Sequence, residues 1–143
     1  MATITPTLTI TSTDLFPDES LSISLTDSLT VNGPATTKRM TIASGETELV
    51  EDQTILDASA YTKSYVLLYN TSTASSGEII TVGNASNDGS GDESLDSADL
   101  SIAPGEFAFF PWNTTVDLVA DANSGDPVLE IRIFLHLRLS HDY

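Results

Sequence analysis

Acidic side chains gather in one low-complexity segment, residues 84–99, with the sequence NASNDGSGDESLDSAD. Carboxylate oxygens are the ligands that Ca²⁺ prefers, and glycines between them permit tight turns. Their spacing departs from the twelve-residue EF-hand loop, which has ligands at alternate positions and a terminal glutamate. The segment is therefore either a calcium site of another kind or a solvated surface loop, and no other cofactor is predicted. The candidate calcium ligands are Asp88, Asp92, Glu93 and Asp96.

The residue types of a nucleophilic triad also occur side by side, as Ser140, His141 and Asp142. A triad is a spatial arrangement of residues that are separated along the chain, so three sequence neighbours do not indicate one. Acids are so abundant that a carboxylate pair for glycoside hydrolysis gives no distinctive signal. The sequence contains no phosphate-binding glycine loop and no zinc-ligand spacing. We therefore predict that the protein is not an enzyme.

Basic side chains are rare, yet two of the five lie on one face of the last predicted strand, residues 128–139. Strict alternation there places Arg132, His136 and Arg138 together, opposite a row of leucines and isoleucines. Such side chains either pair with acids of neighbouring strands in the same sheet or form a docking face for an acidic surface, such as that of an identical subunit. The sequence leaves both possibilities open, and we count the three residues as candidate interface residues.

An aromatic cluster, FAFFPW, holds three phenylalanines and the only tryptophan of the chain. Alternation predicts that Phe107 and Phe109 join the core and that Phe110 and Trp112 lie near the outside or the rim. An exposed Trp–Phe pair is either a sugar-stacking platform or an anchor for a protein interface. The alternative is that Trp112 closes one end of the core.

The elements that position all these residues are predicted to be strands. Period-2 alternation of apolar and polar residues dominates, and no segment shows a convincing 3.6-residue period. The segment 64–70, SYVLLYN, is nearly continuously apolar, as expected of a strand buried on both faces, and it is predicted to form a hairpin with EIITVG. A Pro-Gly pair at 104–105 predicts a type II turn. We predict an all-β fold: an antiparallel β-sandwich or jelly roll of about eight short strands.

The N-terminal segment alternates apolar residues with threonines and contains Pro6. Proline cannot donate to a sheet ladder, so the segment is predicted to be an edge strand or an extended arm. We place this arm at residues 1–13 and a single β-sandwich domain at 14–143. The apolar residues Ile4, Leu8 and Ile10 are further candidate interface residues.

The charge balance restricts the possible partners. Twenty-one Asp and Glu against five Lys and Arg give a formal net charge of −16. Nucleic-acid binding depends on basic groups that replace counterions, so neither nucleic acid nor an anionic membrane is an expected partner. Cysteine is absent, so no disulfide is possible. No signal peptide or apolar membrane span is recognisable, and synthesis in a cytoplasm is expected.

The run SYVLLYNTST…GEIITVG followed by LSIAPGEFAFFPW resembles a pattern common in small β-proteins of tailed-phage virions. The likeness covers residues 64–112, about a third of the chain. The acidic, cysteine-free, Ser/Thr-rich composition is similar to that of proteins from phages of marine bacteria or cyanobacteria. This resemblance implies a capsid decoration (cement) protein, which has no enzyme activity and commonly sits as a trimer on the major capsid protein. It supplies no functional residues to carry over.

The expected function is therefore that of a non-enzymatic structural protein on the outer capsid surface, made in the host cytoplasm. A strongly acidic protein is repelled from packed DNA, and its charge is harmless on the exterior. The expected partners are the major capsid protein and identical subunits in a homotrimer. The alternative is a carbohydrate-binding or adaptor module of a tail or host-attachment spike, with Trp112 and Phe110 as the exposed platform.

Overall fold

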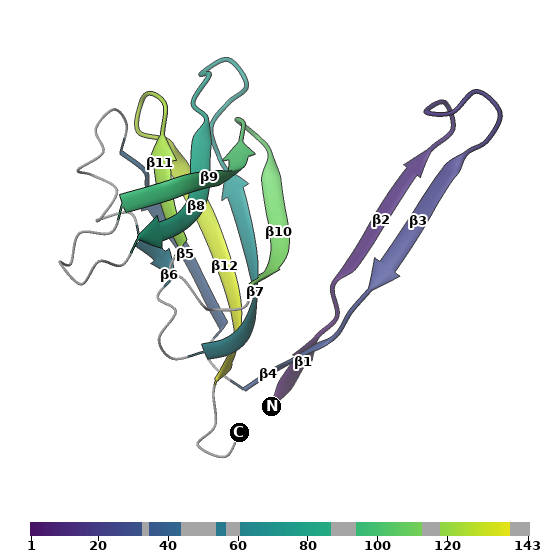
Figure 1. Ribbon diagram of the computed structural model, residues 1–143, viewed down its shortest axis with the longest axis horizontal. Helices are drawn as coiled ribbons and strands as arrows, with labels where there is room; N and C mark the ends of the chain where they lie inside the picture. Colours follow the sequence, from purple (N-terminus) through teal and green to yellow (C-terminus); the bar gives the residue numbers. More distant parts are fainter. Residues whose placement is uncertain (33–34, 44–53, 57–60, 87–93, 113–117, 138–143) are drawn as a thin grey trace. The chain divides into compact units, whose positions relative to one another are not determined.

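The computed structural model describes residues 1–32, 35–43, 54–56, 61–86, 94–112 and 118–137 (Figure 1). These residues form strands and connecting turns and contain no helix, which confirms the all-β prediction. The number of strands exceeds the eight predicted, and part of the excess consists of short strands of only three residues. The twelve strands are β1 (Ala2–Ile4), β2 (Thr7–Ser12), β3 (Leu21–Thr26), β4 (Leu29–Val31), β5 (Ala35–Thr41), β6 (Thr54–Leu56), β7 (Tyr61–Asn70), β8 (Ile80–Ser86), β9 (Ser94–Ile102), β10 (Phe107–Trp112), β11 (Leu118–Ala122) and β12 (Val128–Leu137).

The chain divides into two compact units, Met1–Asn32 and Gly33–Tyr143. The sequence analysis placed the boundary after residue 13 instead. The difference arises because β3 and β4 pair back onto β2 and β1 rather than onto the rest of the protein. Residues 14–32 therefore belong with the arm, and the arm is a two-stranded structure rather than a single extended strand.

The N-terminal unit is one long antiparallel ribbon, formed by the β1–β4 and β2–β3 pairs. Both pairs keep the same register, since the residue numbers of every partner pair add up to 33, from Ala2 opposite Val31 to Ser12 opposite Leu21. The break between the two pairs is bridged by the backbone N–H of Asp27, which donates to the Pro6 carbonyl at 3.1 Å. Pro6 lacks an N–H of its own, which explains why the ladder is interrupted there.

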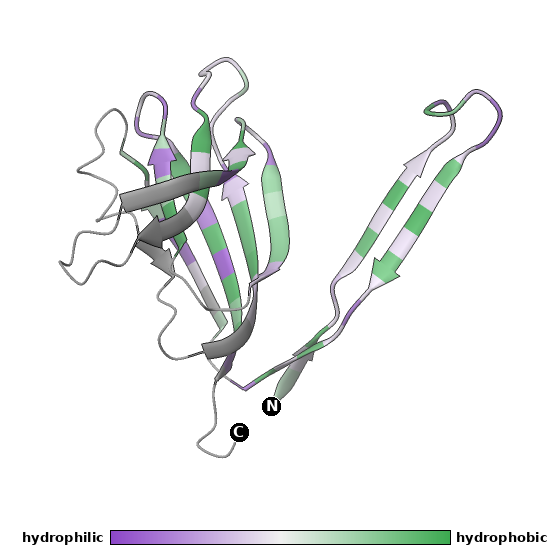
Figure 2. Cartoon of the chain, in the orientation of Figure 1, coloured by the Kyte–Doolittle hydropathy of each residue, from purple (hydrophilic) through white to green (hydrophobic). Residues whose placement is uncertain are grey.

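The two faces of this ribbon differ sharply in chemistry, because partners in an antiparallel pair project to the same side. One face of β2–β3 is aliphatic, with Leu8 opposite Leu25 and Ile10 opposite Ile23. The other face bears only hydroxyl side chains, and Thr7 and Thr26 are hydrogen-bonded across it, with 3.1 Å between their Oγ1 atoms. Figure 2 shows this alternation as hydrophobic and pale bands along both strands. The four cross-strand pairs of the hydroxyl face are Thr3–Thr30, Thr7–Thr26, Thr9–Ser24 and Thr11–Ser22.

The second unit contains two four-stranded antiparallel sheets, ordered β10-β7-β12-β5 and β6-β11-β8-β9. Both sheets contribute side chains to one hydrophobic core, such as Leu68 and Ile131 from the first sheet and Val82 and Ala120 from the second. All members of this core cluster come from residue 42 onward, so the core of the second unit is complete without the ribbon. The chain therefore combines a packed β-domain with a ribbon that contributes nothing to that core.

Asn70, the last residue of β7, joins the two sheets. Its side chain is fully buried, and its Nδ2 donates to the carbonyls of Glu78 at 2.8 Å and Ile102 at 3.0 Å. Its Oδ1 accepts the backbone N–H of Ser72 at 3.1 Å. The carbonyl of Ile102 ends β9 in the opposite sheet, so this amide satisfies backbone groups where the chain passes between sheets.

The predicted hairpin between residues 64–70 and EIITVG is wrong, because β7 and β8 belong to different sheets. The predicted turn at 103–106 is confirmed: the N–H of Glu106 donates to the Ala103 carbonyl at 3.0 Å, and Gly105 has φ +78°. That turn also leads from β9 in one sheet to β10 in the other. A connection between the sheets thus replaces the local hairpin that the sequence suggested.

Candidate interaction surfaces

Exposed large apolar side chains occur in two places within the described part of the chain. The first is the N-terminal ribbon, and the second is the outer face of β10 and β7 in the second unit. Contiguous apolar surface of this kind marks interaction sites more often than scattered exposed residues do. The exposed members are Met1, Leu8, Ile10, Leu15, Phe16, Ile23 and Leu25 in the first unit, and Tyr69, Phe107 and Phe109 in the second.

The aliphatic face of the ribbon, defined as Leu8, Ile10, Ile23 and Leu25, is the first surface. Leu8 and Leu25 are 52% and 62% exposed although they lie directly opposite one another. Two strands have no second layer of their own to cover such a face, and an isolated two-stranded ribbon is only marginally stable in water. Three residues of the arm were predicted to be interface residues. Leu8 and Ile10 lie together on this exposed face, whereas Ile4 is half-buried.

The ribbon unit also has a one-sided charge. Residues 1–32 contain no Lys or Arg. Its side-chain charge is therefore wholly negative at neutral pH, which favours a partner surface that bears basic groups. The acids of this unit are Asp14, Asp18, Glu19 and Asp27.

The second surface, here called the aromatic edge, consists of Phe107, Phe109 and Tyr69. Phe107 is opposite Tyr69 in the β10–β7 pair and is 69% exposed. The ring of Phe109 stacks on that of Tyr65, with centroids 5.3 Å apart and an interplanar angle of 3°. Strand β10 is the outermost strand of its sheet, so these rings lie along an accessible margin.

The prediction that Phe107 and Phe109 join the core while Phe110 and Trp112 face outward is wrong. The pairing places Phe110 opposite Val66 and Trp112 opposite Ser64, on the inner face of the sheet. Trp112 is 6% exposed, and Phe110 packs against the core cluster. Because FAFFPW is apolar at nearly every position, the sequence does not reveal which alternate set faces inward; pairing with β7 decides it.

Trp112 bears an unusual polar group for a core residue. Its indole Nε1 is buried and has no hydrogen-bond partner among the residues that the structure describes. Leaving such a donor unsatisfied costs about 1–3 kcal/mol, which the burial of the large indole ring offsets. Neither Trp112 nor Phe110 presents an exposed platform, so neither is retained as an interface residue.

A row of charged side chains crosses the outer face of the same sheet. Glu130 on β12 lies opposite Arg39 on β5, and its Oε2 is 3.8 Å from the Arg39 Nε. Its Oε1 accepts the Arg132 Nη2 at 3.2 Å. One carboxylate thus faces two guanidinium groups that remain more than half exposed. His136 lies on the same side and is half-buried, whereas Arg138 is outside the described residues.

No protein-family model matches this chain. No curated protein and no solved structure is significantly similar to it either. Among the residues that the structure describes, no helix has the length and apolar character that crossing a membrane requires. The surfaces must therefore be interpreted from their own chemistry.

The calcium hypothesis falls mainly outside the described residues. Asp88, Asp92 and Glu93 are not described, and only the backbone of Asp96 is placed, in β9. Within the described ranges, no group of three or more acidic or histidine side chains is arranged to hold a metal ion. The calcium site therefore stays a sequence prediction.

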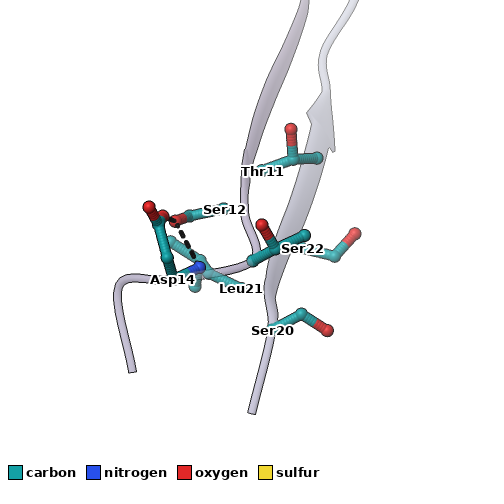
Figure 3. Close-up of a pocket in the computed structure, with 7 residues that line it drawn as sticks. Thr11, Ser12, Asp14, Ser20, Leu21 and Ser22 are labelled. Atoms are coloured by element: carbon teal, nitrogen blue, oxygen red, sulfur yellow. Dashed lines mark hydrogen bonds between the residues drawn. The ribbon is translucent and has the colours of Figure 1, made fainter. Parts of the chain in front are cut away.

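A shallow hollow of about 520 Å³ lies at the tip of the ribbon (Figure 3). Ser12 is hydrogen-bonded to the turn beside this hollow. Its Oγ donates to the Asp14 carboxylate at 2.9 Å and accepts the N–H of Leu15 at 3.1 Å. None of the lining residues is buried, so the hollow does not enclose a ligand. It is lined by Thr11, Ser12, Thr13, Asp14, Ser20, Leu21 and Ser22.

Proposed function

We propose that the protein is a non-enzymatic structural protein that decorates the outer surface of a virus capsid. In this proposal the second unit is a β-sandwich domain, and the ribbon joins the protein, as a homotrimer, to its neighbours on the shell. The observation that supports the proposal is the ribbon itself: a two-stranded element whose aliphatic face is exposed. An element of this kind gains its stability from a partner surface.

The amphipathic division of the ribbon favours a partner that is a protein. Four aliphatic side chains aligned on one face match the core of a protein interface, where charged residues are depleted. The opposite hydroxyl face is compatible with solvent. A ribbon that lies flat on another protein buries the first face and leaves the second exposed.

The charge of the chain favours the outside of a capsid over the inside. A formal net charge of −16 opposes contact with packed nucleic acid. On the exterior the same charge keeps particles apart and soluble. The resemblance of residues 64–112 to small tailed-phage proteins supports the same location.

The direct test is immunogold labelling of purified virions with an antibody raised against the second unit. Gold distributed over the whole shell is the expected result, because a decoration protein occupies many equivalent sites. Labels confined to the tail or its tip would instead support an attachment-spike module. Virions without label would reject a virion location.

The second candidate function is carbohydrate binding, which the aromatic edge favours. Phe107, Phe109 and Tyr69 are exposed aromatic residues of the kind against which a sugar packs, in place of the buried Trp112. A glycan array with the wild-type protein and a Phe107→Ala variant separates the two candidates. Glycan binding that the variant loses would favour the spike module, and a blank array would favour the decoration protein.

A further inference from the structure

We propose that β10 of the second unit binds an extended segment of another protein, which adds to the sheet as a further strand. The segment has apolar side chains at alternate positions and basic residues at its ends. This goes beyond the proposed function, because it names the chemistry of a partner at a strand to which the decoration function gives no role.

The hydrogen-bond pattern of β10 shows which of its backbone groups face away from the sheet. The N–H of Asn70 donates to the Glu106 carbonyl at 3.0 Å, one pair beyond the register of β10 with β7. Hydrogen-bonded and non-hydrogen-bonded pairs alternate along an antiparallel ladder, so the even-numbered residues of β10 are the ones bonded to β7. The N–H and C=O groups of Phe107 and Phe109 therefore project away from β7, along the outer margin of the sheet.

Pro111 agrees with this pattern. It is odd-numbered like Phe109, and proline is tolerated on an edge strand where the missing N–H would face outward. At an even-numbered position it would remove a bond to β7. The margin therefore offers the N–H and C=O groups of Phe107 and Phe109 and the C=O of Pro111, and an extended backbone presents donors and acceptors at the matching spacing.

The other three edge strands of the two described sheets have features that oppose strand addition along their length. Strand β5 carries Lys38 and Arg39, and charged side chains protect an edge. Strand β9 is bulged at Asp96 and Asp99, which its pairing with β8 skips. Strand β6 has only three residues. In β10 the proline lies near the end, and residues 107–110 are uncharged and pair with β7 without a register shift.

Apolar side chains flank this margin on both faces of the sheet. Phe107 and Phe109 are 69% and 40% exposed on the outer face. Ala108 and Phe110 on the inner face pack against the core cluster but are only partly buried. A strand added here covers part of both sets with its own alternate side chains. The greater exposure of Phe107 and Phe109 favours apolar residues at the positions opposite them.

The charge of the protein favours a segment with basic ends. Seventeen Asp and Glu against five Lys and Arg give residues 33–143 a formal net charge of −12. That field attracts basic residues that flank the incoming strand, while β10 itself has no charged side chain that the strand must match. The β10 edge of a second copy, FAFFPW, bears no basic residue, so a segment of a different protein fits this margin better.

Hydrogen exchange followed by NMR tests the proposal on the full chain. The probe is a short blocked peptide in which threonine and valine alternate between two terminal lysines. The peptide is expected to slow the exchange of the Phe107 and Phe109 amides about tenfold or more. The amides of Ala108 and Phe110 already bond to β7, so their exchange should change little.

Two variants of Phe109 separate the contribution of the backbone from that of the ring. Phe109→Ala removes the ring and keeps the N–H, whereas Phe109→Pro removes both and spares the bonds to β7. The dissociation constant of the peptide, measured by fluorescence anisotropy, should rise about fivefold more in Phe109→Pro than in Phe109→Ala. Circular dichroism checks that both variants fold, and if the proline variant does not, the exchange measurement on the wild-type chain decides.

Other outcomes overturn the proposal. One is that exchange at Phe107 and Phe109 stays unchanged with the peptide at millimolar concentration. Another is protection at Thr37 and Arg39, whose amides face outward from β5, because the segment would then bind the opposite edge. Protection of Phe107 and Phe109 that grows with protein concentration, without peptide, would identify a second copy as the occupant.

A peptide with terminal glutamates in place of the lysines tests the charge argument. It should bind more weakly, and equal binding would overturn the basic character assigned to the segment. All these measurements use the purified chain and a peptide, so their outcome is independent of virion labelling. Labelled capsids without peptide binding would reject only the strand addition, and peptide binding without labelled capsids would reject only the decoration function.

Discussion

Leu8 lies directly opposite Leu25 in the N-terminal ribbon, and each leucine side chain is more than half exposed. Paired leucines of this kind normally form a core, and covering the exposed part of each one with apolar surface stabilises by about 1–2 kcal/mol. The core cluster of the second unit begins at Ile42 and does not include these leucines. The proposed function assigns this exposed face to a partner surface.

Deletion of residues 1–32 is expected to leave the second unit folded. The core cluster contains no residue from the ribbon unit, so its packing is unchanged by the deletion. The midpoint of thermal unfolding of the truncated chain should stay within about 4 °C of the corresponding transition in the full chain. Differential scanning calorimetry checks this, and a truncated chain without a cooperative transition would show that the two units depend on one another.

Replacement of Asn70 by alanine is expected to destabilise the second unit by about 2–4 kcal/mol. The substitution leaves the carbonyls of Glu78 and Ile102 and the N–H of Ser72 without their present partner. Urea unfolding gives the free energy of unfolding. The matched control is Ser75→Ala in the adjoining exposed loop, for which a change within about 0.5 kcal/mol is expected. Equal stability of the Asn70 and Ser75 variants would contradict the role assigned to the amide.

Replacement of Gly125 by alanine is expected to cost more than the same change at Gly77. Both residues have positive φ, +60° and +69°, so each variant pays about 1 kcal/mol or more for the left-handed backbone. Only at Gly125 does the new methyl group collide with a neighbour, the carboxylate of Glu78. That carboxylate also accepts the Ser72 hydroxyl at 2.8 Å, so moving it aside breaks this hydrogen bond. A larger loss at Gly77 in urea unfolding would refute this explanation.

Charge reversal of Arg39 and Arg132 together is expected to weaken self-association. Exposed ion pairs contribute about 0.2–1 kcal/mol each, so the double variant should raise the dissociation constant about two- to thirtyfold. Raising the salt concentration should reduce the difference between wild type and variant, since exposed charges are screened. The control for added negative charge is Ser75→Glu in the exposed loop after β7. Sedimentation velocity measures both effects, and equal weakening by the control would indicate a nonspecific charge effect.

The sequence predicted the fold class because strand alternation is a local signal. Period-2 patterns in 7–11, 21–25 and 128–139 identified strands that the structure contains. The turn around Gly105 was predictable for the same reason, since its conformation depends on four neighbouring residues.

Strand partners were not predictable in the same way. The arm was taken as a single strand because alternation in residues 21–25 does not state which strand it pairs with. The segment 64–70 and EIITVG looked like a hairpin because a short loop separates them, but β8 pairs with β9 and β11 in the opposite sheet. Both errors concern tertiary pairing, which overrides local pattern.

The inward face of β10 could not be deduced either. In FAFFPW both the odd-numbered and the even-numbered positions are apolar, so hydropathy alone does not show which set of side chains faces the core. The register that places Phe110 opposite Val66 settles the choice and turns Phe107 and Phe109 outward. The aromatic edge was therefore missed, although the excess of aromatic residues in a single short strand was a usable signal.

The solution mass of the full chain, compared with that of a Leu8→Ser/Leu25→Ser variant, tests the central claim most directly. Light scattering should give a multiple of the 15.2 kDa chain for the wild type and the single-chain mass for the variant. A Thr9→Ala/Ser24→Ala variant, altered on the hydroxyl face, should keep the wild-type mass. A wild-type protein that remains at 15.2 kDa at every concentration tested, with the same mass for both variants, would contradict the account.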